Sequence, residues 1–192
     1  MRDSLPTVVL ASASPRRRQL LNAAGVVVVV APTDLDETPG TNEAPRDLVV
    51  RLARAKAAAA GAVDGLVVAA DTTVAVDDEI LNKPIDDDDA RRMLRLLSGR
   101  AHSVFTGWCV RDGAAESAGV VETTVTFRTL DDDDIEAWLA TGEHRDKAGA
   151  YGVQGAAASL VAQIHGSLTN VIGLPLDEVL HALRAFAATR RI

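Results

Sequence analysis

Short runs of β-branched residues alternate along this chain with segments that carry helix signals, and this alternation constrains the fold most strongly. Five strands are predicted, at residues 8–11, 26–30, 66–70, 103–110 and 122–128. Five helices are predicted between them, at 15–24, 45–60, 87–97, 132–140 and 175–189. Prolines (Pro15, Pro45 and Pro175) take first helical positions, and glycines (Gly25 and Gly99) follow helix ends. The class is therefore mixed α/β, with residues 167–174 fitting neither pattern.

Composition narrows the classes of function. The 192 residues are 47% hydrophobic, which suits one globular domain over residues 1–192. The net charge of −7 and the aromatic content of 3% exclude a broadly basic or base-stacking nucleic-acid binder. A single cysteine, Cys109, cannot form an internal disulfide, and no apolar stretch approaches the length of a membrane span. The chain start has no signal-peptide pattern, so we expect a cytoplasmic protein that binds neither nucleic acid nor membrane.

The start of the first helix is a candidate anion site. Ser14 suits the N-cap, and three consecutive arginines beginning at Arg16 fill the first turn, where the helix dipole is already positive. That placement costs about 0.3–1 kcal/mol per charge unless an anion lies there. Ser12, Ser14, Arg16 and Arg17 therefore suggest a phosphate site built with backbone N–H groups, and a solvated basic turn is the alternative.

The second predicted helix carries a lysine on its apolar side. Residues 48, 52, 55 and 59 form one apolar stripe, and Lys56 falls roughly 30° from the centre of that stripe. Arg51 and Arg54 point to the far side. The Lys56 stem either extends along the core so that its ammonium reaches solvent, or projects the ammonium into a cleft to meet an anion, and the pattern leaves both open.

A carboxylate follows the apolar run at residues 66–70. Asp71 is expected at the carboxyl end of this strand, a common position for ligand sites in α/β sheets. It suits a divalent cation and an attacking water, and the alternative is a turn cap. A short hairpin from residues 74–76 to 79–81 leads to Lys83, which we expect near the same strand end.

The acidic residues are of two kinds. Runs of four aspartates at 86–89 and 131–134 each precede a predicted helix, so we interpret them as caps that complement the helix dipole rather than as a metal cluster. Glu37, close to Asp34 and Asp36, precedes no clear helix. It is a candidate metal or hydroxyl partner.

The glycine-spaced segment at residues 146–155 holds a candidate base reader. Its pattern is neither the Rossmann nor the Walker motif, and its glycines permit close approach of the backbone to a ligand. Gln154 offers a donor and acceptors for the imide or amide edge of a base, and the alternative is a structural turn with Tyr151 in the core. The histidines (His102, His144, His165 and His181) lack metal-ligand spacing, and we interpret them and Cys109 as structural or surface residues.

Together these segments resemble the Maf family of nucleoside triphosphate pyrophosphatases. The matching stretches, in family order, are 10–21 (LASASPRRRQLL), 51–56 (RLARAK), 70–73 (ADTT), 82–84 (NKP), 97–102 (LSGRAH), 146–155 (DKAGAYGVQG) and 170–176 (NVIGLPL). The resemblance implies an elongated α/β fold, with a mixed β-sheet flanked by helices and two lobes around a central cleft. It also implies hydrolysis of a nucleoside triphosphate to the monophosphate and pyrophosphate with Mg²⁺ or Mn²⁺, and it leaves open whether the chain forms a homodimer.

The resemblance also assigns roles to single residues. The residues assigned to the triphosphate are Ser12, Ser14, Arg16, Arg17, Lys56 and Lys83, and those assigned to the metal and water are Glu37 and Asp71. Lys56, Lys83 and Asp71 are the catalytic candidates, with Asp71 activating water for attack at the α-phosphorus. The substrate-dividing positions, Arg16, Thr72 and Gln154, are similar to the branch acting on dTTP and UTP, with 5-methyl-UTP and 5-methyl-CTP as further candidates. The implied role is the removal of non-standard nucleotides.

Other functions remain open at this point. A cell-division regulator could bind a triphosphate without turning it over, but a pure binder gains nothing from Asp71 beside phosphates unless a metal intervenes. Specificity for 7-methyl-GTP is the second alternative. RNA binding through residues 16–18 is disfavoured by the negative net charge and the scarcity of aromatic residues.

Overall fold

The computed structural model describes residues 6–61, 63–77 and 79–190, so the chain start at residues 1–5 lies outside the described part. The strands are β1 (Val8–Leu10), β2 (Val28–Val30), β3 (Leu66–Val76), β4 (Glu79–Leu81), β5 (Ala101–Asp112), β6 (Ala115–Phe127) and β7 (Val161–His165). The α-helices are α1 (Pro15–Ala23), α2 (Pro45–Ala59), α3 (Asp87–Leu97), α4 (Asp132–Leu139), α5 (Leu168–Ile172) and α6 (Leu176–Thr189). Two 3₁₀ helices, η1 (Ala148–Ala150) and η2 (Gly155–Leu160), complete the described elements.

The described strands form one mixed, open sheet. Its order is β2-β1-β3-β5-β6-β7, with β4 paired to β3. Strand β1 pairs in parallel with β2 and β3, whereas β3–β4 and β6–β7 are antiparallel. This confirms the predicted α/β class with a mixed sheet and flanking helices.

The chain divides into two compact units. The first unit comprises Met1–Asp71, Thr106–Val121 and Gly173–Ile192, and the second comprises Thr72–Phe105 and Glu122–Ile172. The three long strands β3, β5 and β6 each contribute residues to both units. Each unit has its own hydrophobic core.

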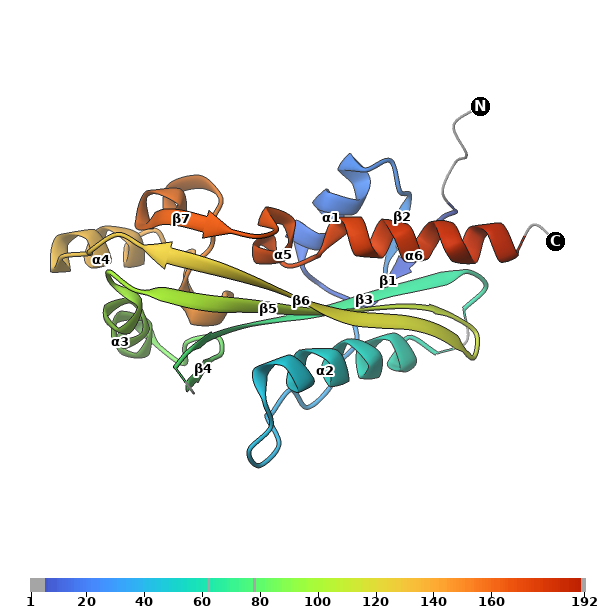
Figure 1. The fold of residues 1–192 in the computed structure, drawn as a ribbon, viewed down its shortest axis with the longest axis horizontal. Helices are drawn as coiled ribbons and strands as arrows, with labels where there is room; N and C mark the ends of the chain where they lie inside the picture. Colours follow the sequence, from blue (N-terminus) through green and yellow to red (C-terminus); the bar gives the residue numbers. More distant parts are fainter. Residues whose placement is uncertain (1–5, 62, 78, 191–192) are drawn as a thin grey trace. The chain divides into compact units, whose positions relative to one another are not determined.

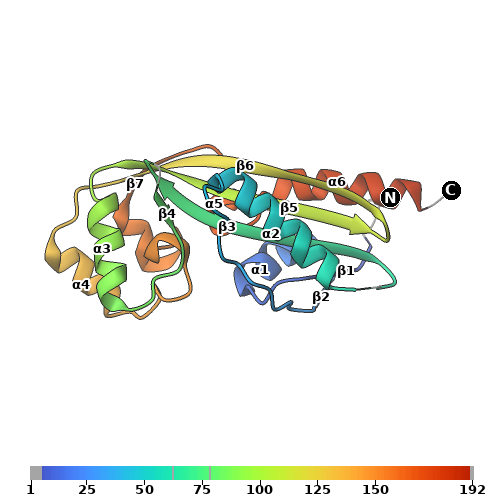
Figure 2. The same ribbon diagram turned by 90° about the horizontal axis from the view of Figure 1, so that it is seen from below.

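In the first unit, β3 separates two apolar layers by the period-two alternation of its side chains. Leu66, Val68 and Ala70 pack with residues of α1 and α6. Val67 and Ala69 pack on the other side with residues of α2. Accordingly, α2 and α6 lie on opposite faces of the strands (Figure 1 and Figure 2).

Helix α2 lies unusually close to β5 of the first unit because of a glycine. A Cβ at Gly107 would lie 2.2 Å from the Val49 carbonyl oxygen, so only a residue without a side chain fits there. This close approach fixes the backbone of α2 against the sheet.

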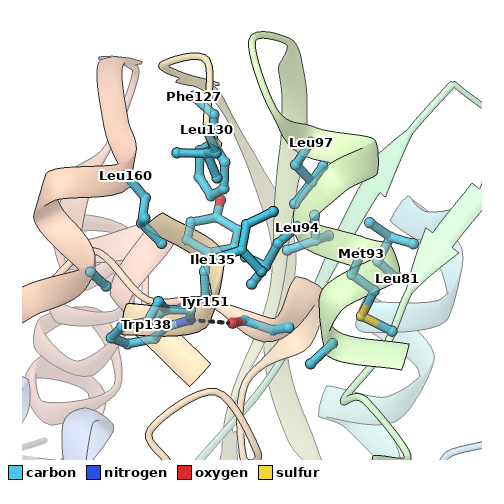
Figure 3. Packing of buried hydrophobic residues seen from close by; sticks show 14 of the residues in the cluster. Leu81, Met93, Leu94, Leu97, Phe127, Leu130, Ile135, Trp138, Tyr151 and Leu160 are labelled. Carbon is cyan, nitrogen blue, oxygen red and sulfur yellow. Dashed lines mark hydrogen bonds between the residues drawn. The ribbon is translucent and has the colours of Figure 1, made fainter. Parts of the chain in front are cut away.

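The second unit is built around the described aromatic residues of its core. Phe127, Trp138 and Tyr151 pack with leucines of α3 in one cluster (Figure 3). The Tyr151 hydroxyl lies 2.6 Å from Nε2 of His102, and both side chains are buried. The interpretation of Tyr151 as a core residue is confirmed.

The aspartate runs cap helices, as predicted. The Asp86 carboxylate accepts the Asp89 N–H at the start of α3 (2.7 Å). Asp131 and Asp134 form a reciprocal capping box at the start of α4.

Several predicted boundaries differ from the structure. Strand β2 starts two residues later than expected, and its Val29 side chain is exposed because β2 is an edge strand paired only with β1 among the described strands. Pro175 occupies the N-cap of α6 rather than its first helical position. The elements β7, η1 and η2 were not predicted, and α5 lies in the segment that fitted neither pattern.

Burial of His102 predicts a specific pH dependence of stability. Desolvation lowers the pKa of His102 to about 4. Between pH 6.5 and pH 4 the imidazole is therefore protonated in the unfolded chain but neutral in the folded protein. About 3 kcal/mol of stability, fully present above pH 6.5, should therefore be lost as the pH falls to 4.

Chemical denaturation between pH 7 and pH 4.5 measures this loss. His102→Gln keeps a hydrogen-bonding partner for Tyr151 but does not titrate, so its unfolding free energy should fall less steeply over this range. Parallel curves for the two proteins would contradict the assignment.

Candidate active site

Asp71 lies inside a strand rather than at its end. Strand β3 continues from Leu66 to Val76, so the predicted position was wrong. The apolar run ends at Ala70, but the strand continues because threonine is β-branched and Thr72 and Thr73 follow Asp71. The alternation of β3 places Asp71 on the same face as Val67 and Ala69, which is the face covered by α2.

Lys56 joins two carboxylates on this face. It lies three residues after Ala53 on α2, so it shares the helix face that packs on the sheet. The side chain is buried, at 7% exposure, and does not reach solvent. Its Nζ lies 2.6 Å from Oδ1 of Asp71 and 2.6 Å from Oε1 of Glu37. The anions that Lys56 meets are thus the two carboxylates assigned to metal and water.

The loop that carries Glu37 is fastened to α2 by residues that the sequence analysis did not assign. Arg51 donates from Nε and Nη2 to the two carboxylate oxygens of Glu43 (2.6 and 2.7 Å), and from Nη2 to the Thr38 carbonyl (3.2 Å). These bonds, with the Gly40 N–H, lower the pKa of Glu43 to about 2. Arg51 was expected to point away from the core. Its side chain is indeed exposed, and it bonds to the loop that carries Glu37.

The loop before α1 is organised by an arginine. Arg17 donates from Nη1 to the Ser12 hydroxyl (3.0 Å) and from Nε to the Gly173 carbonyl (2.8 Å). The Ser12 hydroxyl also accepts the Ser14 N–H (3.2 Å). Ser14 occupies the predicted N-cap position, but its side chain makes no capping bond.

Charge links this loop to the two carboxylates. Burial lowers the pKa of the Arg17 guanidinium, and so does the neighbouring charge of Arg16, while Asp71 and Glu37 oppose the shift. The first turn of α1 contains no acidic residue, so its dipole and its arginines present positive potential. That this loop binds an anion, rather than being a solvated turn, stays a prediction.

The predicted site residues divide between the two units. Ser12, Ser14, Arg16, Arg17, Glu37, Lys56 and Asp71 belong to the first unit, where contacts and charges link them. The other three belong to the second unit: Thr72 is half-buried in β3, Lys83 is exposed after β4, and Gln154 is exposed at the N-cap of η2. That Lys83 lies near Asp71 stays a prediction.

The remaining candidate ligands have structural surroundings. His102 and His144 are buried, and burial raises the pKa of the Cys109 thiol to about 11, which makes it a poor nucleophile. His165 and His181 are exposed. Among the described residues, no group of three or more His, Cys, Asp or Glu side chains could hold a metal ion. No described helix is long and apolar enough to cross a bilayer.

The first unit thus defines an α/β protein with a basic loop before α1 and a buried lysine that joins two carboxylates. The family model described as Maf-like protein matches residues 7–186, and the chain belongs to this family. The match spans residues of both units.

Curated relatives cover nearly the whole chain. A dTTP/UTP pyrophosphatase of Anaeromyxobacter dehalogenans (strain 2CP-C) is 50% identical over 184 residues, which are 93% of each protein. A dTTP/UTP pyrophosphatase of Sphingopyxis alaskensis is 52% identical, covering 91% of this chain and 93% of the relative. A third of that name, from Geobacter sulfurreducens, is 51% identical, covering 94% of this chain and 97% of the relative.

The ion cluster predicts a large stability loss when its cation is removed. Lys56→Met leaves the buried Asp71 carboxylate without its ammonium partner, which should cost about 3–5 kcal/mol of unfolding free energy. Urea denaturation at neutral pH measures the loss, and the double variant Lys56→Met/Asp71→Asn should recover part of it.

Arg54→Met is the matched control on the same helix. Arg54 is exposed and pairs at the surface with Glu116, so its loss should cost at most about 1 kcal/mol. Equal losses for Lys56→Met and Arg54→Met would contradict the importance of the buried cluster.

Proposed function

We propose that the protein is a nucleoside triphosphate pyrophosphatase that hydrolyses dTTP and UTP to the monophosphate and pyrophosphate. The observation that carries the proposal is the Lys56 ammonium between Asp71 and Glu37, in the unit that also presents the basic loop before α1. Relatives named dTTP/UTP pyrophosphatase, about half identical to this chain, support the substrate.

The donor set suits a hard divalent cation. Asp71 and Glu37 each bring a carboxylate oxygen to within 2.6 Å of one point, the Lys56 Nζ, and Mg²⁺ or Mn²⁺ prefers such oxygen ligands. Magnesium sites commonly use one or two carboxylates and complete their shell with substrate phosphates and water, so two protein ligands suffice. Asp71 and Glu37 would hold the ion, which when bound offsets the charge of the phosphate oxygens.

In the proposed reaction, the Asp71 carboxylate orients a water and accepts its proton. The water oxygen attacks the α-phosphorus in line, the bond to the bridging oxygen of the β-phosphate breaks, and pyrophosphate leaves. Lys56 fixes the Asp71 carboxylate through the 2.6 Å ion pair. No covalent intermediate is needed, which agrees with the inert surroundings of Cys109.

The cationic residues bind the triphosphate in this proposal. Arg16 and the backbone N–H groups at the start of α1 contact phosphate oxygens, and Lys83 neutralises further charge. Arg17 is also assigned to the triphosphate, and its Nε and Nη1 hold the Gly173 carbonyl and the Ser12 hydroxyl. Through these two bonds Arg17 would also fix the conformation of the loop before α1.

The base would be selected by Thr72 and Gln154. An amide side chain can donate to one group of a uracil or thymine edge and accept from its imide N–H. A site that reads only this edge leaves the 5-position unread, so 5-methyl-UTP is a candidate substrate. 5-methyl-CTP, which carries an amino group in place of the carbonyl and no imide N–H, is a candidate only if the Gln154 amide turns over to exchange its donor and acceptor. The proposed cellular role is the removal of non-standard nucleotides.

Pyrophosphate release from a nucleotide panel tests the function. With Mg²⁺ or Mn²⁺, the wild-type protein should turn over dTTP and UTP, and Asp71→Asn should reduce kcat by about 10²–10⁴-fold, because general-base catalysis contributes this much. Asp133→Asn is the matched control, since Asp133 is an exposed residue in the first turn of α4, and it should retain wild-type activity.

The same panel separates the alternatives. Preferred turnover of 7-methyl-GTP over dTTP and UTP would instead identify a 7-methyl-GTP pyrophosphatase. Tight triphosphate binding without pyrophosphate release in wild type and variant alike would instead identify a nucleotide-binding regulator.

A further inference from the structure

A buried polar pair lies in the apolar core of the second unit. Tyr151 and His102 are 5% and 3% exposed, and the Tyr151 hydroxyl lies 2.6 Å from Nε2 of His102. Both rings also make edge-to-face contacts with Phe127. A phenylalanine would supply the same apolar packing without a buried hydroxyl that needs a partner. The hydrogen bond therefore fixes the position of the Tyr151 hydroxyl and with it the direction of the ring axis.

The backbone just before Tyr151 is held in an unusual conformation. Gly149 and Ala150 have φ of 68° and 62°, a left-handed conformation that is costly for alanine. The Gly149 N–H donates to the Asn82 carbonyl (3.1 Å), and the Trp138 indole N–H donates to the Ala150 carbonyl (2.9 Å; Figure 3). Tertiary bonds thus hold this backbone on the residues preceding Tyr151.

Gln154 lies between this anchor and a second one. It follows Tyr151 by three residues and occupies the N-cap of η2, where its side chain is exposed and makes no capping bond. After it, Ala157 and Leu160 of η2 are buried in the same core. The backbone at Gln154 is therefore fixed from both sides, while its side chain faces solvent.

The other proposed substrate residues of the second unit adjoin the same network. Asn82, which precedes Lys83, accepts the Gly149 N–H through its carbonyl and the Thr73 hydroxyl through Oδ1 (3.3 Å). Thr73 directly follows Thr72. One connected set of tertiary hydrogen bonds thus adjoins the residues proposed to bind base and phosphate.

We propose that His102 and Tyr151 are positioning residues, which fix the glycine-rich segment so that Gln154 is presented to the nucleobase in a single orientation. This inference rests on the proposed function. Neither residue contacts the substrate, and both act through the backbone between Tyr151 and Gln154.

Tyr151→Phe tests the inference because it keeps the ring and removes the hydroxyl. The KM for UTP and dTTP should rise about five- to tenfold, with kcat changed less than twofold, since an interaction made equally in ground and transition states is weakened. Preference for UTP over CTP should fall by a similar factor. Amide hydrogen exchange should quicken at residues 149–155 and remain unchanged in α6.

Three further variants separate positioning from general stability. His102→Gln retains a partner for the hydroxyl and should keep a nearly wild-type KM, whereas His102→Leu should behave as Tyr151→Phe. Ala137→Gly, at an exposed position of α4, lowers stability through helix propensity alone and should leave KM unchanged.

A double variant tests the route through Gln154. If Tyr151 acts through Gln154, Tyr151→Phe should add no further rise in KM to the Gln154→Ala protein. Additive effects, or a Tyr151→Phe protein that melts lower with unchanged KM and base preference, would overturn the inference. Failure of the proposed function gives a different result, because the wild-type protein would then release no pyrophosphate from pyrimidine triphosphates.

Discussion

The ion pair between the Lys56 ammonium and the Asp71 carboxylate is the interaction on which the proposed chemistry depends. Both groups are buried, and burying either charge in an apolar layer without the other would cost several kcal/mol of folding free energy. Their pairing is possible because two unrelated periodicities coincide. The period of two along β3 turns Asp71 toward α2, and the helical period along α2 turns Lys56 toward β3. Glu37 then supplies the second carboxylate from a loop that Arg51 and Glu43 hold against α2.

The two units contribute different kinds of group. The first unit carries the carboxylates, Lys56 and the basic loop, which suit phosphate chemistry. The second unit carries Thr72, Lys83 and Gln154, which suit recognition of the substrate, and tertiary hydrogen bonds hold the backbone near them. The boundary between the units falls between Asp71 and Thr72, so adjacent residues of β3 belong to the two groups. If Thr72 and Gln154 select the base as proposed, a change of base specificity in the second unit can leave the carboxylate cluster of the first unit intact.

Local signals predicted much of the fold. Helix α3 begins and ends at the predicted residues, because an aspartate caps it and Gly99 with a φ of 67° follows it. Lys56, Asp71 and the loop before α1 were each notable from neighbouring residues alone. Strand β7 was missed because its short sequence, VAQIH, owes its conformation to pairing with distant β6. Three side-chain contacts were also not predicted from the sequence, those of Arg51 with Glu43, Arg17 with Gly173 and His102 with Tyr151. Each contact joins a residue of a helix or strand to a residue outside that element, and no local sequence pattern relates the two.

A crystal structure of the protein at a resolution that defines side-chain atoms tests the central claim most directly. The account predicts a buried Lys56 whose Nζ lies within hydrogen-bonding distance of the Asp71 carboxylate, with Glu37 close enough that both carboxylates can share one cation. A Lys56 side chain extended into solvent, or Asp71 and Glu37 on separate surfaces, would contradict it.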